Sequence, residues 1–279
     1  VIYKKKQNED DADDDEYLEE NAMIVEEILR QRLEGIKNEK GVYVTPAFPK
    51  LIYVLDEHNC LKGGKYDYIT KLAVECSSKR LYPDYISAKQ MRATYQGNVF
   101  SCMGCRSFLS PWKDENGNFK FEGRFNQGVV SINLPQIGIL ANKDEDAFWK
   151  LFDERLELCF EALMVRHNAL KGIKSDVSPI HWQYGAIARL NKGETIDKLL
   201  YGGYSTISLG YAGLCECTRY MTGKSHTNPE ATPFALAVMQ HLNDACDKWK
   251  TETNIAFSVY GTPLESTTYK FAKCLQKRF

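Results

Sequence analysis

The sequence predicts an α/β fold in which parallel strands are covered by helices. Segments typical of helices and of strands alternate along the chain, which is the order expected when helical crossovers join parallel strands. The chain has 279 residues and is 43% hydrophobic, which is enough to bury one large core. We find no internal repeat or linker that divides these alternating segments.

Composition narrows the class of protein. The formal net charge of −1 gives no sign of a surface for nucleic acid or membrane. No run of about eighteen apolar residues is present, so we expect no spanning helix. Nine cysteines without a signal peptide predict a reducing, cytoplasmic location. The chain starts at Val1 rather than Met and stops abruptly at Phe279, so we expect an internal piece of a longer protein.

The first 20 residues are expected to be an acidic, flexible segment. Residues 7–20 are rich in carboxylates and nearly devoid of large apolar groups, so they repel one another and have little surface to bury. Residues 21–36 then have the spacing of an amphipathic helix. Its expected inner side holds Ile24, Ile28 and Leu29, and its expected outer side holds Glu26, Arg30 and Arg32.

The middle of the first half predicts short strands and one clear helix. Apolar residues recur with helical spacing over residues 66–79, and Cys76 is expected to pack in the core there. Residues 86–95 are ambiguous, and the polar D-E-N-G-N at 114–118 predicts a turn. Short strands are expected at 42–44 and 51–55.

The second half predicts two long helices between buried strands. Residues 129–134 are β-branched and mostly apolar, which is typical of a strand buried on both faces. Asp144 or Asp146 could cap the helix that follows. Helices are expected at 148–170, 233–252 and 264–275, a shorter element at 182–189, and strands at 204–214 and 255–260.

Residues 98–126 carry the most distinctive chemistry. If the backbone is extended there, side chains alternate with period two, so Met103, Cys105 and Ser107 point one way and Cys102 points the other. That arrangement suits a loop that presents one thiol to a cavity, with a thioether and a hydroxyl beside it. Met103 could equally fill space.

Three interpretations of the Cys102 and Cys105 pair compete on spacing alone. The pair has the CxxC spacing of half a zinc site, for which Cys215 and Cys217 would have to supply an unusual CxC partner. It also has the spacing of thiols used in redox or radical chemistry. The third interpretation is two small buried thiols, since free cysteines pack well in cores.

Several longer stretches resemble the anaerobic (class III) ribonucleotide reductases. S-C-M-G-C-R-S-F-L at 101–109 is followed by G-R-F-N-Q-G-V-V-S-I-N-L-P at 123–135. Further matching stretches are T-P-A-F-P-K-L-I-Y at 45–53, I-S-L-G-Y-A-G-L-C-E at 207–216 and Y-G-T-P-L-E-S-T-T at 260–268. They lie in the family's order and cover most of the chain.

The resemblance implies a ten-stranded α/β barrel built from two parallel five-stranded halves. A finger loop threads the barrel and carries the catalytic cysteine. Residues 21–279 would be much of this barrel, without the family's N-terminal ATP-binding cone or its C-terminal glycyl radical and zinc region. This piece would therefore be inactive alone.

The resemblance also assigns roles to individual residues. Cys105 would become a thiyl radical that abstracts the 3′-hydrogen of a ribonucleoside triphosphate, with Met103 and Ser107 beside it. Asn126 matches the family's active-site asparagine, whose amide can donate to and accept from a ribose hydroxyl or formate. From the residues alone, Asn126 could instead be a turn residue before Gln127.

A segment between a strand and a helix near the end of the chain would bind the substrate phosphates. Its hydroxyls and proline are ordinary helix-capping residues, but a helix start also offers free N–H groups and a positive dipole end. By resemblance Thr262, Ser266 and Thr267 take the phosphates, and Glu265 could reach the ribose or cap the helix.

Cofactors and partners follow from the same resemblance. The radical would rest on a glycine outside this chain and be made by a radical S-adenosylmethionine activating enzyme. Formate would be the reductant, ATP and deoxynucleotides the effectors, and a homodimer the assembly. We expect no metal in this chain, and zinc only in the family's C-terminal region. Two alternatives stay open: another glycyl radical enzyme acting on a small molecule, or a non-enzymatic interaction domain with zinc on the four cysteines named above.

Overall fold

The computed structural model describes residues 17–46, 48–102, 108–109, 111–114, 116–121, 123–262 and 266–279. The chain divides into two compact units, residues 1–101 and 102–279. Met103, Cys105, Ser107 and Glu265 lie outside the described residues, as does most of the acidic segment.

The first unit contains a parallel strand pair and a helical layer. Strands β3 and β4 are parallel and in continuous register, and the helices α2 and α3 connect them. The strand at 51–55 and the helix at 66–79 were predicted, whereas β4 was not. The antiparallel pair β1–β2 is a departure from the all-parallel expectation. The elements are α1 (Leu18–Glu34), β1 (Ile36–Lys37), β2 (Tyr43–Val44), β3 (Ile52–Leu55), α2 (Glu57–Cys60), α3 (Asp67–Arg80), β4 (Asp84–Ser87) and α4 (Ala88–Thr94).

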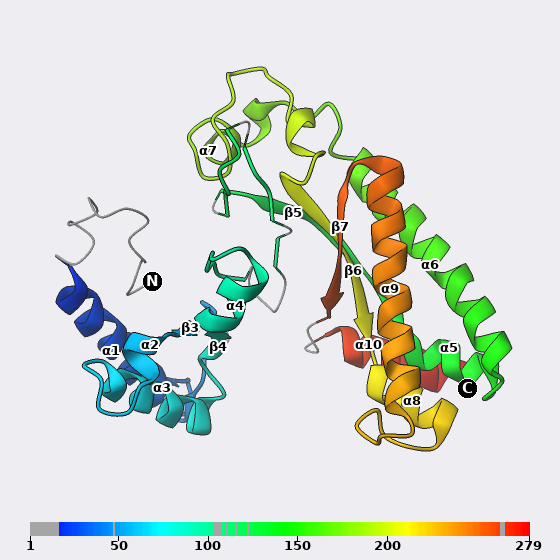
Figure 1. Ribbon diagram of the computed structural model, residues 1–279, viewed down its shortest axis with the longest axis horizontal. Coiled ribbons are helices and arrows are strands. Elements are labelled where there is room, and N and C mark those ends of the chain that lie inside the picture. The colour runs from blue at the N-terminus through cyan, green and yellow to red at the C-terminus, as the bar shows by residue number, and fades with distance from the viewer. Residues whose placement is uncertain are drawn as a thin grey trace. The chain divides into compact units, whose positions relative to one another are not determined.

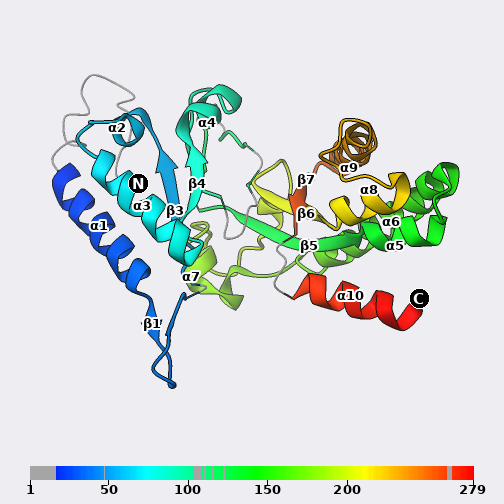
Figure 2. The ribbon, with the colours of Figure 1, turned by 90° about the horizontal axis from the view of Figure 1, so that it is seen from below.

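Helix α1 lies along α3, and the core of this unit is between them (Figure 2). The face of α1 that is buried differs from the expected one: Ile24 and Ile28 are 57% and 44% exposed, whereas Leu29 is 1% exposed. The prediction that Arg32 points outward is also wrong. Arg32 is buried, and its guanidinium donates to the carbonyl oxygens of Pro46 and Pro49, which satisfy its hydrogen-bonding groups there. α1 begins at Leu18, inside the acidic segment.

The second unit contains a three-stranded parallel sheet in the order β5–β6–β7. Helices connect each strand to the next, which confirms the predicted α/β alternation (Figure 1). The elements are β5 (Phe125–Asn133), α5 (Leu134–Ala141), α6 (Glu145–Asn168), α7 (Pro179–Trp182), β6 (Ser205–Ala212), α8 (Leu214–Thr222), α9 (Thr232–Thr253), β7 (Ala256–Gly261) and α10 (Thr267–Arg278), with short 3₁₀ turns at Ser175–Val177 and Asp197–Leu199.

Two long helices cover one face of this sheet. Ile207 and Leu209 of β6 are fully buried in an apolar cluster with Phe152 of α6 and Leu242 of α9. Figure 1 shows α6 and α9 running alongside the strands. The expectation that residues 129–134 form a strand buried on both faces is wrong, since Val129 is 37% exposed.

Local signals explain where several elements begin. The Asp144 carboxylate accepts the N–H of Ala147 at 2.9 Å, which confirms a predicted helix cap. Asp114 accepts the backbone N–H groups of Asn116 and Asn118 at 2.9 and 2.8 Å, which confirms the predicted turn. Helix α5 is capped by the Asn133 amide and was not predicted, nor was α8.

The described strands form two separate parallel sheets and one antiparallel pair. The expected ten-stranded barrel needs more strands than the described residues form, and the residues of its expected finger loop are only partly described. Across the described ranges, every helix is either too short or too polar to cross a bilayer.

Candidate active site

The face of the β5–β6–β7 sheet opposite α6 and α9 carries small polar side chains. Along β6, Thr206 and Ser208 alternate with Ile207 and Leu209, so the two hydroxyls point away from the apolar cluster. Register pairs Thr206 with Asn126 of β5, and Ser208 with Ser258 of β7. We call this set the polar face, and its members are Asn126, Ser131, Thr206, Ser208, Ser258 and Thr262.

Asn126 lies at the centre of the hydrogen bonds on the polar face. Its Nδ2 donates to Ser208 Oγ at 2.6 Å and to Thr206 Oγ1 at 3.1 Å. Its Oδ1 accepts the Gly128 N–H at 2.7 Å. The structure therefore places this predicted site residue within the sheet, cross-linked to β6, and not in a free turn.

A β-bulge directly follows Asn126 in β5. The register between β5 and β6 shifts between Asn126 and Val129. Gly128 within the bulge has φ +152°, a conformation that favours glycine, and a Cβ there would stand 2.1 Å from Arg166 Nε. The intervening Gln127 is buried. As neighbours in an extended strand, Asn126 and Gln127 project to opposite sides of β5, Asn126 toward Thr206 and Ser208 and Gln127 toward Ser205.

Gln127 anchors the bulge from the side that faces α6. Its Nε2 donates to Leu200 O and to Ser205 Oγ, both at 2.9 Å. Because that end of the amide is the donor, its Oε1 accepts from Nδ1 of His167 at 2.7 Å. The other ring nitrogen of His167 is buried without a hydrogen-bond partner among the described residues. Burial lowers the pKa of His167 below its ordinary value, so the ring is neutral.

Thr262 joins the polar face at the end of β7. Its Oγ1 lies 2.7 Å from Ser131 Oγ of β5, and its N–H donates to Tyr211 O at 3.1 Å. The two hydroxyls meet above Gly210 of β6, where a Cβ would stand 2.4 Å from Ser131 Oγ and 2.5 Å from Thr262 Oγ1. The absence of a side chain at Gly210 is what allows the pair to form.

The other expected phosphate-binding residues lie at the start of α10. Ser266 is exposed at the N-cap position and makes no side-chain capping bond, and Thr267 is the first helical residue. Residues 263–265, which include Glu265, fall outside the described ranges. The structure thus brings Thr262 to the polar face next to Ser131 and puts Ser266 and Thr267 at the first turn of α10, whose N–H groups have no partner within the helix.

The described cysteines range from buried to exposed, and Cys102 and Cys215 are half-buried. Cys215 and Cys217 lie on α8, where burial raises the pKa of the Cys217 thiol to about 12. No cluster of three or more His, Cys, Asp or Glu in the described part of the chain is arranged to hold a metal ion. Cys105 lies outside that part, so its catalytic role stays a prediction.

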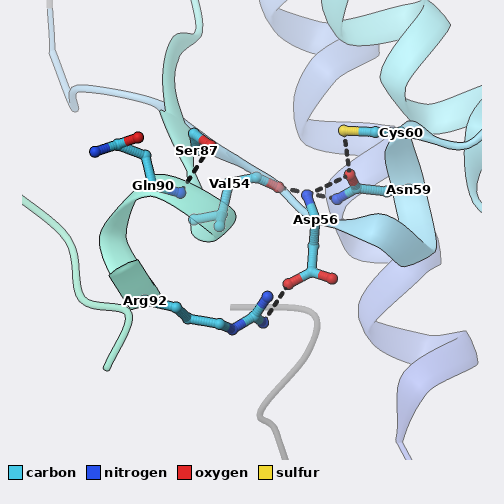
Figure 3. Close-up of polar contacts among 7 residues, drawn as sticks. All are labelled: Val54, Asp56, Asn59, Cys60, Ser87, Gln90 and Arg92. Atoms are coloured by element: carbon cyan, nitrogen blue, oxygen red, sulfur yellow. Dashed lines mark hydrogen bonds and ion pairs between the residues drawn. The ribbon is translucent and has the colours of Figure 1, made fainter. Parts of the chain in front are cut away.

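A second polar cluster ends the β3–β4 pair in the first unit (Figure 3). Asp56 follows β3, and its carboxylate lies 2.5 Å from the guanidinium of Arg92 on α4. The Asp56 N–H donates to Asn59 Oδ1 at 2.9 Å, while Asn59 Nδ2 donates to Val54 O at 2.9 Å. Ser87 caps α4 by accepting the Gln90 N–H at 3.2 Å. We call Asp56, Asn59 and Arg92 the strand-end cluster.

Sequence reasoning missed most of the polar face. The expected strand at 204–214 contains Ile207 and Leu209, and no role was predicted for the neighbouring hydroxyls of Thr206 and Ser208. The usable signal was the alternation in T-I-S-L at 206–209, whose polar and apolar positions each recur with period two. Thr206 and Ser208 could have been assigned to one face of the strand in that way, whereas Ser131 and Ser258 join them only through strand pairing.

The comparisons with known proteins agree on one family over most of the chain. The profile of a family described as anaerobic ribonucleoside-triphosphate reductase matches residues 5–279. The protein of that name from Escherichia coli (strain K12) is 41% identical over 259 residues, which cover 91% of this chain and 36% of the relative. The protein of that name from Enterobacteria phage T4 is 42% identical over 258 residues, covering 90% of this chain and 41% of the relative.

Solved structures show the same fold at low sequence identity. The anaerobic ribonucleotide reductase from Thermotoga maritima with citrate in the active site matches 98% of this chain and 45% of that chain, with a TM-score of 0.60 and 14% identity. The structure of that enzyme in complex with dATP and CTP matches 88% of this chain and 36% of that chain, with a TM-score of 0.55 and 13% identity. The chain therefore spans less than half the length of the proteins it matches.

Proposed function

This chain belongs to the anaerobic ribonucleoside-triphosphate reductase family, and from that premise we propose that it forms the catalytic α/β-barrel portion of a longer enzyme that reduces ribonucleoside triphosphates to deoxyribonucleoside triphosphates. The observation that carries the proposal is the family match over residues 5–279, which includes the thiol-bearing stretch before β5. The strands β3 to β7 would be part of a ten-stranded barrel, and residues 98–126 its finger.

Cys105 is the residue that starts the reaction in this proposal. A thiyl radical at Cys105 takes the 3′-hydrogen atom of the ribose, so an S–H bond forms as the C3′–H bond breaks. The 2′-hydroxyl then leaves as water, and formate supplies two electrons as it becomes carbon dioxide. Summed over one turnover, a ribonucleoside triphosphate, formate and a proton give a deoxyribonucleoside triphosphate, carbon dioxide and water. The chemistry requires a pocket closed to water.

The described residues supply binding and orientation. Asn126 projects from the centre of the polar face, where its amide is held by β6. Thr262 at the same face and Ser266 and Thr267 at the start of α10 would bind the triphosphate through hydroxyls and first-turn N–H groups. Glu265 lies between them in sequence and would reach the ribose. Met103 and Ser107 would line the site beside Cys105.

The remaining parts of the system are proposals from family membership alone. A glycyl radical, made by a radical S-adenosylmethionine activating enzyme, would supply the oxidising equivalent that converts the Cys105 thiol to its radical. ATP and deoxynucleotides would act as effectors of a homodimeric enzyme. Residues 1–20 would be an acidic segment ahead of the barrel portion at 21–279.

The proposal is tested by replacing the thiol in the full-length reductase. Cys105→Ala, activated without oxygen, should show a normal glycyl radical by electron paramagnetic resonance and form no deoxynucleotide. Cys102→Ala is the matched control, because it removes the other thiol of the same CxxC pair and should keep most of the activity. Substantial nucleotide reduction by Cys105→Ala would move the chemistry elsewhere and make residues 98–126 a structural loop.

A further inference from the structure

The orientation of the Asn126 amide is fixed by its partners. A backbone N–H can only donate, so the atom 2.7 Å from the Gly128 nitrogen is the amide oxygen. The Nδ2 group therefore faces β6, where both of its hydrogens have acceptors, at Ser208 Oγ and Thr206 Oγ1. Among the described residues, the one position of the amide without a partner is a lone pair on Oδ1.

Ser208 accepts the shorter of these two bonds and also pairs with the hydroxyl of Ser258, where either oxygen can donate. Its oxygen accepts from Asn126 at 2.6 Å and lies 3.1 Å from Ser258 Oγ of β7. Ser208 and Thr206 are both fully buried, so neither exchanges these partners for bulk water. One line of hydrogen bonds therefore runs from β5 through β6 to β7.

We propose that Ser208 is the positioning residue of Asn126, holding its amide so that only an Oδ1 lone pair is left to meet the substrate. This rests on the function proposed above. An amide held in this way accepts a hydrogen bond from a ribose hydroxyl, and it cannot donate one to the carboxylate of formate. Formate must then be bound by other donors.

A matched control exists on the same strand. Ser205 is also fully buried, but it lies on the opposite side of β6, where its hydroxyl donates to Leu199 O at 2.6 Å and accepts from Gln127. Replacing Ser205 with alanine removes the same atom from the same strand without touching Asn126. A role of Ser208 in packing alone would make the two alanine variants equivalent.

The kinetic test uses the full-length reductase with Ser208→Ala, Ser205→Ala, Ser208→Thr, Asn126→Ala and the Asn126→Ala/Ser208→Ala double variant. Ser208→Ala should lower kcat about tenfold, the effect of one hydrogen bond of about 1.4 kcal/mol, with an unchanged glycyl radical signal. Ser208→Thr should restore most of the loss. In the Asn126→Ala background, Ser208→Ala should have no further effect, because the group it positions is gone.

A second readout does not depend on turnover. In the same protein labelled with ¹⁵N-asparagine, hydrogen exchange of the Asn126 side-chain amide should be much faster in Ser208→Ala than in the wild type and unchanged in Ser205→Ala. Equal kcat losses in Ser208→Ala and Ser205→Ala, a loss that persists without Asn126, or unchanged amide exchange in Ser208→Ala would each overturn the proposal. A wild-type protein that reduces no ribonucleotide would overturn the proposed function instead, and amide exchange would still decide the role of Ser208.

Discussion

The two parallel sheets of this chain place their polar side chains differently. In β3–β4 the strand-end cluster lies beyond the strands, and its members bond to one another and to the local backbone. In β5–β6–β7 the polar side chains lie within the sheet and bond from strand to strand across one face. Polar groups that are satisfied locally end a strand. Polar groups aligned across a face, opposite an apolar layer, are the arrangement that the proposed substrate site uses.

Among the variants that test this comparison, the largest loss of stability is expected at Gly210. Gly210→Ala would push its Cβ against the Ser131 and Thr262 hydroxyls and should cost about 1–3 kcal/mol in the free energy of unfolding. The control is Gly261→Ala in β7, where the nearest atom to a new Cβ is 3.8 Å away, and it should change stability by less than about 0.5 kcal/mol. All four tryptophans lie in the second unit, so urea unfolding followed by their fluorescence reports on this unit alone. Equal stability of the two variants would show that the hydroxyl pair can move aside.

A smaller effect is expected in the strand-end cluster. Arg92→Ala leaves the Asp56 carboxylate, 10% exposed, without its ion pair, and should destabilise the first unit by about 1–2 kcal/mol. In Arg92→Ala, hydrogen exchange of the β3 and β4 amides should become faster. The variant should still reduce nucleotides under conditions where it stays folded. Lys79→Ala, which removes an exposed ion pair with Glu75, should cost less than about 0.5 kcal/mol. If Arg92→Ala kept slow amide exchange but lost nucleotide reduction, the comparison would fail. The strand-end cluster would then be part of the active site.

The smallest expected effect is a dependence of folding stability on pH, which comes from His167 next to Gln127 of the β-bulge. His167 has its pKa lowered in the folded state by burial and by the charge of Lys171, so the unfolded state binds the proton first as the pH falls. The stabilisation from neutral His167 is complete above its ordinary pKa of about 6.5 and is lost as the pH drops toward the folded value. His167→Gln should flatten that dependence in tryptophan-monitored unfolding. The same slope in both proteins would assign the pH dependence to other groups.

Sequence reasoning was most successful where one long pattern determined one element. Helices α3, α6 and α9 and strands β6 and β7 were predicted within a few residues, because their apolar residues repeat with a clear period. Helix α5 was missed because L-P-Q-I-G-I-L-A is apolar almost throughout and follows β5 without a break. Helix α8 was missed because the strand before it was extended through Gly213, whose φ of +80° in fact ends the strand.

The site was only partly predictable, since its decisive contacts are tertiary. Asn126 and Thr262 came from a family resemblance, while their partners Ser208 and Ser131 have no local signal beyond being small and polar. For Arg32 a local signal was present but led to a wrong prediction. Its charge predicted exposure, but the carbonyls of Pro46 and Pro49, distant in sequence, provide a buried place for it.

The separation in sequence between the partners on the polar face also has a consequence for the order of folding. Asn126 and Ser208 are 82 residues apart, and Ser131 and Thr262 are 131 residues apart. Helices such as α6 can form early from local contacts, whereas each of these pairs requires a long loop to close first. The candidate site should therefore be assembled late, after the helices that cover the other face of the sheet. During synthesis, none of its cross-strand bonds to β7 can form until the ribosome has released residues 256–262.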